Sequence, residues 1–412
     1  MKIKTIYLFT AIAAAIVLTA SCRKTPVACI KSDKTTAAIN ETITFISCSE
    51  NAETTEWDFG DGSSAEGNSV TYAYSTAGTY TVKITAFSKR EKKKDETSIS
   101  ITIITSNGGG SAPPNTWTKK ADFGGEDRAY AVGFSIGSKG YIGTGDRLWN
   151  GPLKDFWEYD PATNVWTQKS DYGGGSRRYA IGFSIGTKGY LGTGDDENFS
   201  ATKDFWEYDP SNNTWTKKTD FGGTARSGAV GFSIGNKGYV GTGYSNNLEK
   251  DFWEYNPATD VWLKKTDFGG TARSNSSGFP IGTKAYIVAG SNANNNYLKD
   301  CWEYDQTNDL WLQKTDLAGG VNGIERHRAF GFAIGNKGYI GTGDRITNGV
   351  QYTMLDFWEY SPASDTWALK TAFDGKAESA RFGAVGFSIG NKGYAGTGVL
   401  GSTLKDFWEY TQ

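Results

Sequence analysis

The stretch RAYAVGFSIGSKGYIGTG at residues 128–145, followed by DFWEYDP at residues 155–161 and by a tryptophan, decides the fold of this 412-residue chain. The pattern occurs six times after residue 115. Its boundary tryptophans are Trp117, Trp166, Trp215, Trp262, Trp311 and Trp367, at spacings of 49, 49, 47, 49 and 56 residues. A fixed period of about fifty residues with aromatic and glycine signatures is typical of propeller blades or of a solenoid.

One repeat contains four short strand signals. Residues 131–136 form an apolar run, residues 137–140 have turn chemistry, and residues 141–145 form a second strand, so the unit begins with a hairpin. An aromatic third strand at 155–160 and a fourth strand at 165–169 complete it. Four short antiparallel strands make one blade. The repeat therefore predicts an all-β, six-bladed β-propeller rather than a solenoid.

The two ends of the repeat array predict how the ring closes. The array begins on a fourth strand at residues 115–120 and ends on a third strand at residues 406–410. The N-terminal strand must therefore complete the last blade, which removes the open edges that invite aggregation.

The residues of the repeat also resemble a known family. The arginine, the glycine-rich second strand, the aromatic-Tyr-Asp-Pro corner and the boundary tryptophan are similar to kelch repeats over residues 115–412. One difference is that the usual glycine doublet after the second strand reads Gly-Thr-Gly here, as at 143–145, and Ala289-Gly290 in the fourth blade.

The N-terminal segment predicts export. Residues 1–21 have a basic start, an apolar run too short for a bilayer, and small residues before Cys22. Thr19-Ala20-Ser21-Cys22 resembles a bacterial lipobox, which implies lipidation of Cys22, a tether at residues 22–25 and a location in the cell envelope, at the outer membrane or cell surface. Ordinary secretion with an unmodified Cys22 is the alternative.

A second domain is predicted before the propeller. Residues 26–105 show period-two alternation, as in Tyr80, Val82 and Ile84, which indicates a small β-sandwich. The motif WDFGDG at 57–62 and AGTY at 77–80 resemble those of a PKD domain, an Ig-like extracellular module. Residues 106–114, rich in glycine and proline, are predicted to be a linker.

Three of the four cysteines remain to be assigned. Cys29 and Cys48 are expected on adjacent strands of the sandwich, where an exported protein can form a disulfide, although the sequence leaves this pairing open. Cys301 replaces the phenylalanine of the DFWEY motif and is predicted to be a small buried hydrophobe.

Composition restricts the classes of partner and site. The net charge is -2, which gives no indication of nucleic-acid binding. The chain has one histidine, His327, which excludes a copper or zinc site built from several histidines. No cofactor, metal or catalytic residue is predicted, and the chain is expected to be a monomer.

The variable rim of the propeller is the predicted recognition face. Loops joining strands 2 to 3 and 4 to 1 share this rim and vary among blades, most of all in blade five, at 317–325 and 344–355. The candidate ligand-binding residues there are Arg128, Arg177, Arg226, Arg273, Arg326, Arg381, His327 and Asp344. The repeated arginines suit carboxylate binding at the channel mouth. Alternatively, each arginine forms an ion pair with the glutamate of the WEY motif or with the aspartate that begins the DFWEY motif.

Two function classes follow from these observations. The first is a lipid-anchored binding module whose propeller recognises a glycan or protein ligand, because no nucleophile and base are brought together by any motif. The second is a sugar-active enzyme similar to a sialic acid mutarotase, with Glu126, Glu325, Glu378 and His327 as possible acid-base groups. We expect the binding module.

Overall fold

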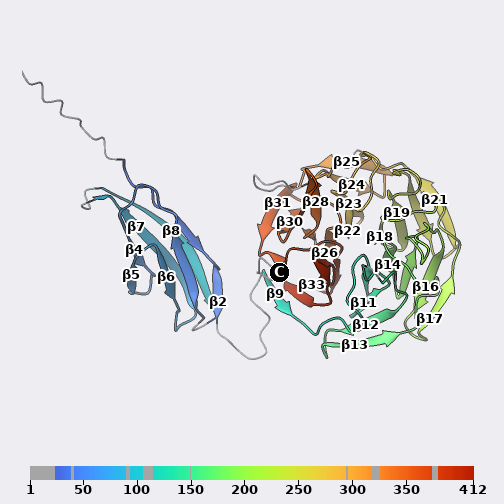
Figure 1. The fold of residues 1–412 in the computed structure, drawn as a ribbon, viewed down its shortest axis with the longest axis horizontal. Helices are drawn as coiled ribbons and strands as arrows, with labels where there is room; N and C mark the ends of the chain where they lie inside the picture. The colour runs from blue at the N-terminus through green and yellow to red at the C-terminus, as the bar shows by residue number, and fades with distance from the viewer. Residues whose placement is uncertain are drawn as a thin grey trace, which may run out of the picture. The chain divides into compact units, whose positions relative to one another are not determined.

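The computed structural model describes residues 24–38, 41–89, 93–104, 115–148, 150–293, 296–317, 325–373 and 379–412. It divides into two compact units, one before and one after residue 113 (Figure 1). Both are built from β-strands. Among the described residues, no helix is long and apolar enough to cross a membrane.

The N-terminal unit is a two-sheet β-sandwich. One sheet has the order β1-β3-β6 and the other β2-β8-β7-β4-β5. The strands are β1 (Ile30–Ser32), β2 (Thr36–Ala38), β3 (Ile43–Ser47), β4 (Thr54–Asp58), β5 (Ser64–Glu66), β6 (Ser69–Tyr72), β7 (Gly78–Phe87) and β8 (Lys94–Ile104). Alternate residues of these strands face inward, which confirms the sandwich predicted from the period-two pattern.

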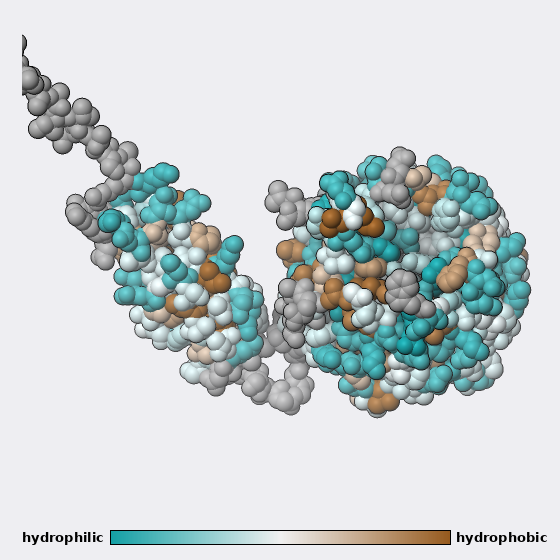
Figure 2. Space-filling view, viewed as in Figure 1, coloured by the Kyte–Doolittle hydropathy of each residue, from teal (hydrophilic) through white to brown (hydrophobic). Residues whose placement is uncertain are grey.

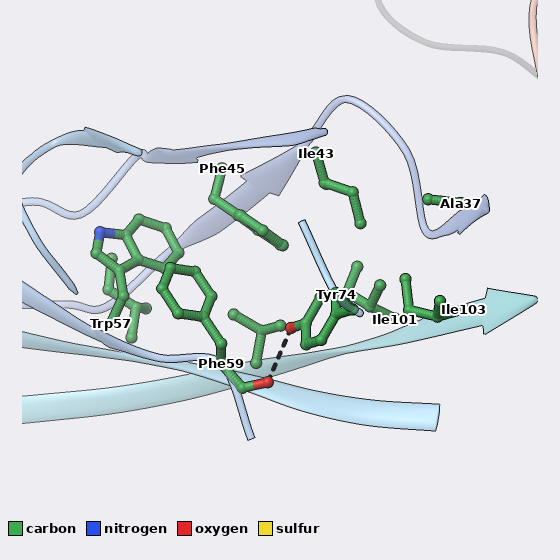
Figure 3. Close-up of a cluster of buried hydrophobic side chains, with 10 residues drawn as sticks. Ala37, Ile43, Phe45, Trp57, Phe59, Tyr74, Ile101 and Ile103 are labelled. Atoms are coloured by element: carbon green, nitrogen blue, oxygen red, sulfur yellow. Dashed lines mark hydrogen bonds between the residues drawn. The ribbon is translucent and has the colours of Figure 1, made fainter. Parts of the chain in front are cut away.

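Aromatic and branched side chains fill the space between the two sheets (Figure 3). Phe45, Trp57 and Phe59 are buried and pack with ring centroids 5.7 to 5.8 Å from Phe45. The hydroxyl of Tyr74 donates a 2.8 Å hydrogen bond to the carbonyl oxygen of Phe59, so the buried phenol has a partner. The Trp57-Asp58-Phe59 motif thus supplies the centre of this core.

The acidic residues that follow Trp57 act as turn acceptors. Asp58 Oδ1 accepts from the backbone N–H of Gly60 at 2.9 Å, and Asp61 Oδ1 accepts from that of Ser63 at 3.0 Å. Gly60 has φ +76°, and a Cβ at this position would lie 2.7 Å from the carbonyl oxygen of Thr81. Only glycine fits this turn without strain.

A disulfide joins Cys29 and Cys48, whose Cα atoms are 4.8 Å apart. The two residues flank the paired strands β1 and β3, where Ile30 lies opposite Ser47. The pairing that the sequence left open is therefore present, because the register of β1 and β3 places the two residues opposite each other.

The C-terminal unit contains six four-stranded antiparallel sheets, arranged as blades around an axis (Figure 1). The first strands are β10 (Val132–Ile136), β14 (Ile181–Ile185), β18 (Val230–Ile234), β22 (Ser277–Ile281), β26 (Phe330–Ile334) and β32 (Val385–Ile389). The second strands are β11 (Lys139–Gly143), β15 (Lys188–Gly192), β19 (Lys237–Gly241), β23 (Lys284–Val288), β27 (Lys337–Gly341) and β33 (Lys392–Gly396).

The third and fourth strands form the outer half of each blade. The third strands are β12 (Phe156–Asp160), β16 (Phe205–Asp209), β20 (Phe252–Asn256), β24 (Cys301–Asp305), β30 (Phe357–Ser361) and β36 (Phe407–Thr411). The fourth strands are β13 (Val165–Lys169), β17 (Thr214–Lys217), β21 (Val261–Lys265), β25 (Leu310–Lys314), β31 (Thr366–Lys370) and β9 (Thr116–Lys119). The last blade has the order β32-β33-β36-β9, so the predicted closure by the N-terminal strand is confirmed.

Aromatic side chains of the repeat pack between neighbouring blades. Phe156 of one blade lies edge-on to Tyr208 and Trp215 of the next, with centroids 4.9 and 5.0 Å apart. Edge-to-face packing is a favoured geometry for buried aromatic rings. Cys301 takes the place of this phenylalanine in blade four and is fully buried, as predicted.

The 2–3 loops of blades five and six contain short hairpins that the sequence reasoning treated as loops. These are β28 (Asp344–Thr347) with β29 (Val350–Thr353), and β34 (Val399–Leu400) with β35 (Ser402–Thr403). Asn348 and Gly349, at the tip of the first hairpin, have φ +52° and +76°. An Asn-Gly pair between strands is a strong hairpin signal, so the sequence alone indicated this hairpin.

Removing strand β9 should open the ring. We expect a chain that lacks residues 1–120 to unfold about 10 °C below one that lacks residues 1–113. The deletion removes a strand of the last blade together with the half-buried Trp117, which packs against Phe330, Phe357 and Phe373, and loss of a large packed aromatic side chain costs about 3 kcal/mol. Differential scanning calorimetry of the two truncated chains measures this. Equal unfolding temperatures would contradict the role assigned to β9.

Candidate functional site

The six repeated arginines are buried inside the blades. At most 3% of each side chain is exposed. In every blade the guanidinium bonds to the aspartate that precedes the third strand. The pairs are Arg128–Asp155, Arg177–Asp204, Arg226–Asp251, Arg273–Asp300, Arg326–Asp356 and Arg381–Asp406.

The arginine-aspartate pair is the centre of a larger repeated contact. In blade four, Arg273 Nη1 and Nη2 each donate a 2.6 Å bond to Asp300, and Nη1 also donates to the carbonyl oxygen of Ala289 at 2.9 Å. The same carboxylate accepts from Trp302 Nε1 at 2.7 Å, and the guanidinium lies 4.8 Å from the ring centroid of Phe268. The arginine, the aspartate and the tryptophan of the repeat therefore belong to one buried network.

The arginine backbone joins successive blades. The carbonyl oxygen of Arg177 accepts a 2.7 Å bond from the N–H of Gly145 in the preceding blade, and that of Arg128 accepts a 2.8 Å bond from Gly398. The structure thus corrects the hypothesis that these six arginines bind a ligand at the channel mouth. A buried guanidinium must be neutralised, and the aspartate of each blade does so, as the alternative interpretation proposed.

A different set of residues surrounds the mouth. These lie two positions after each arginine and adopt left-handed backbone conformations, with φ between +53° and +66°: Tyr130, Tyr179, Gly228, Asn275, Arg328 and Gly383. We call them the inner ring. The N–H of each donates to the carbonyl oxygen of its counterpart in the preceding blade, at 2.8 to 3.1 Å, and Tyr130 donates to Gly383 to complete the circle.

The inner ring holds different side chains on an identical backbone. Tyr130 and Tyr179 stack with centroids 4.2 Å apart, and Arg328 Nη1 donates to the hydroxyl of Tyr130 at 3.2 Å. Gly383 lies between Arg328 and Tyr130 in the ring, and a Cβ there would lie 2.5 Å from the Tyr130 ring. The ring residues and the residues after them line a cavity of about 120 Å³. The mouth is thus crowded on one side and open toward Gly228 and Asn275.

His327 and Asp344, both predicted site residues, lie together beside the inner ring. Asp344 is fully buried and accepts from Arg328 Nε at 3.0 Å and from Gln351 Nε2 at 2.6 Å. His327 Nε2 lies 3.0 Å from Asp344 Oδ1, and the imidazole packs edge-on to Tyr297. Asp344 thereby holds Arg328 across the mouth.

The protonation states of this group follow from burial and charge. Burial alone would raise the pKa of Asp344, but His327 and Arg328 outweigh it and hold that pKa below its usual value. Burial lowers the pKa of His327, and the charge of Arg328 lowers it further against the attraction of Asp344. We therefore treat Asp344 as ionised and His327 as neutral at pH 7.

A second charged group lies on the blade-two side of the mouth. Arg178 Nη1 donates to Asp146 at 2.6 Å, and its Nε lies 3.6 Å from Asp195. Its guanidinium is 4.4 Å from the ring centroid of Phe199, a side chain that is 57% exposed. Burial raises the pKa of Asp195 despite the nearby Ser227 and Arg178.

Glu126 and Glu325, two of the glutamates considered as acid-base groups, have arginine partners in different blades. Glu126 pairs with Arg147 in blade one, whereas Glu325 lies 3.9 Å from Arg345 in blade five. Glu378, Cys22 and residues 318–324 lie outside the described residues. Sequence reasoning did not select Tyr130, Tyr179, Arg178, Arg328 or Asp195. The first four lie one or two positions after a repeated arginine, where the residue varies among blades, and Asp195 begins a variable 2–3 loop.

Comparisons with known proteins agree with this architecture. Residues 28–101 match the model of the PKD domain, and residues 272–318 match that of the Kelch motif. The chain joins a PKD domain to a kelch-type propeller. The solved structure of YjhT aligns with 71% of this chain and 97% of its own, at a TM-score of 0.60 and 16% identity, which supports the propeller fold. No curated protein matches the sequence.

The arginine-aspartate pairs of the kelch-type propeller should govern its stability. We expect Arg226→Ala to lower the free energy of unfolding by about 3–5 kcal/mol, because it leaves the partly buried Asp251 without its partner. The double variant Arg226→Met with Asp251→Leu should recover much of this loss. Urea unfolding measures both. A change below about 1 kcal/mol for Arg226→Ala would contradict a scaffold role.

The same pairs predict acid sensitivity. Burial alone would raise the pKa of Asp251, Asp356 and Asp406, but bonds from their arginines and tryptophans lower it overall. Their contribution to stability is complete above the unfolded pKa of about 3.9 and is lost as the pH falls through the lower folded pKa.

We therefore expect the urea midpoint of the propeller to decrease between pH 5 and pH 2. The Arg226→Met, Asp251→Leu variant, which lacks one such pair, should lose less over the same interval. An equal loss in both chains would show that these carboxylates do not control the acid transition.

Proposed function

We propose that this protein is an exported, lipid-anchored binding protein whose propeller recognises a glycan or protein ligand at the mouth of its central channel. Export and lipidation rest on residues 1–22, and the PKD domain would hold the propeller away from the membrane. The protein would then be located in the cell envelope, at the outer membrane or cell surface, as a monomer.

One observation carries the proposed binding site. The inner ring repeats the same backbone hydrogen bond in all six blades, yet its side chains are Tyr, Tyr, Gly, Asn, Arg and Gly. The scaffold does not require this variation, because each conformation is set by the backbone and by the arginine two residues earlier. Blade-specific side chains on a rigid scaffold are the usual form of a recognition site.

The surface around the mouth also suits recognition. Figure 2 shows a mostly hydrophilic propeller with small apolar patches, one of them near β28. The β28–β29 hairpin contains Ile346, Val350 and Tyr352, which are 45%, 51% and 48% exposed. Large exposed apolar side chains on a rim of variable loops are typical of contact surfaces.

The alternative of a sugar-active enzyme required free arginines beside an acidic group. The six repeated arginines are occupied by aspartates, and the two at the mouth, Arg178 and Arg328, bond to Asp146 and Asp344. This pairing of the arginines supports the binding protein over the enzyme.

Tyr179→Ala should weaken ligand binding at least tenfold, because it removes a stacking partner of Tyr130 and a wall of the mouth. The full chain is presented to a glycan array and to candidate envelope proteins, and the affinity of any ligand found is compared between wild type and variant. Leu263→Ala, which changes an exposed apolar side chain on the outer strand β21 away from the mouth, is the control. Equal binding by wild type and Tyr179→Ala would place the ligand elsewhere.

A further inference from the structure

The charges at the mouth indicate which class of ligand it takes. Each of the six repeated arginines is neutralised within its blade and contributes no net charge. Among the described residues, the ion pairs directly beside the inner ring are formed by two arginines, Arg178 and Arg328, and three aspartates, Asp146, Asp195 and Asp344. With His327 neutral, this formal charge is one unit negative. An anionic ligand would therefore be repelled rather than attracted.

The two arginines at the mouth are also poorly placed to bind an anion. Arg328 donates to both oxygens of Asp344 through Nε and Nη2, so the fork of donors that would bind a carboxylate is occupied. Arg178 lies between Asp146 and Asp195 and beneath the ring of Phe199. Each guanidinium also packs against an aromatic ring, Arg178 against Phe199 and Arg328 against Phe382.

The open side of the mouth, at blades three and four, presents neutral polar groups. Asn275 and Ser276 line the cavity beside Gly228. Ser227 precedes Gly228 and exchanges two backbone hydrogen bonds with Tyr244, at 2.8 and 2.9 Å. Amides and hydroxyls both donate and accept hydrogen bonds. These amide and hydroxyl groups therefore suit a ligand rich in hydroxyl groups, which also donate and accept hydrogen bonds.

Exposed aromatic rings border the same side. Tyr244 is 51% exposed and Phe199 is 57% exposed, and each lies on the 2–3 loop of its blade. The face of an aromatic ring is electronegative and attracts the weakly positive C–H groups of a saturated ring. Asp195, half-buried beside Ser227, adds a strong acceptor for hydroxyl donors.

We propose that the mouth binds an uncharged, hydroxyl-rich sugar on the side formed by blades two, three and four, with Asp195 and Asn275 as hydrogen-bonding groups and Tyr244 as the stacking surface. This inference rests on the proposed function, because it assumes that the mouth is the binding site. It adds the ligand class and the part of the rim that contacts it. The cavity of about 120 Å³ accommodates part of one sugar residue, so we expect a chain end rather than a buried ligand.

The test uses the full chain on an array of neutral glycans and of carboxylate- or sulfate-bearing glycans. We expect neutral glycans to bind, with an affinity that changes less than about twofold between 50 and 500 mM NaCl, because screening does not affect an uncharged ligand. Asp195→Asn and Tyr244→Ala should each weaken that binding about tenfold. Asp195→Asn should still fold, because Arg178 keeps its bond to Asp146. Leu263→Ala, on the outer strand β21, should bind as wild type does.

The outcomes separate this inference from the proposed function. One outcome is selective, salt-sensitive binding of acidic glycans, and another is binding of a protein alone. If Tyr179→Ala abolishes either kind of binding, the neutral-sugar inference is overturned and the mouth remains the binding site. A folded chain that binds no neutral glycan would also overturn it. Neutral-glycan binding that is unchanged in Tyr179→Ala, Asp195→Asn and Tyr244→Ala would overturn both.

Discussion

The bond between a buried arginine and the aspartate before the third strand is the interaction on which the propeller depends. A guanidinium without solvent is tolerated only when a carboxylate and other acceptors surround it. In each blade this pair connects the 4–1 loop to the third strand, and in five of the six pairs both guanidinium Nη atoms reach the aspartate. The tryptophan N–H that shares the carboxylate connects the aromatic core to the same network.

This network also sets the path of the chain at the mouth. The arginine backbone accepts a bond from the preceding blade, and two residues later the chain forms the inner ring of hydrogen bonds. Six equivalent anchors therefore produce six equivalent backbone positions around the axis. Because the backbone is fixed by groups buried below it, the side chains above can differ from blade to blade without loss of the fold.

The electrostatic character of the mouth follows from the same arrangement. Neutralising the six repeated arginines internally removes what would otherwise be the largest positive charge near the axis. The local field is then determined by a few blade-specific residues, chiefly Arg178 with Asp146 and Asp195, and Arg328 with Asp344. A propeller with the same repeat and other residues at these positions would have the same fold and a different ligand preference.

The sequence by itself determined the number of blades, their four strands and the closure by β9, because these depend on local alternation and on a period that needs no knowledge of distant contacts. It also contained the signal for the Asn348-Gly349 hairpin. It left the role of the arginines open, since Asp and Glu partners recur at equal intervals in every repeat. Only the tertiary structure decided that Asp is the partner, and that Tyr130, Tyr179 and Arg328, from three separate blades, meet at one mouth. Ring closure brings these residues together across up to 198 positions of sequence, and the side-chain pattern within a single repeat carries no information about such contacts.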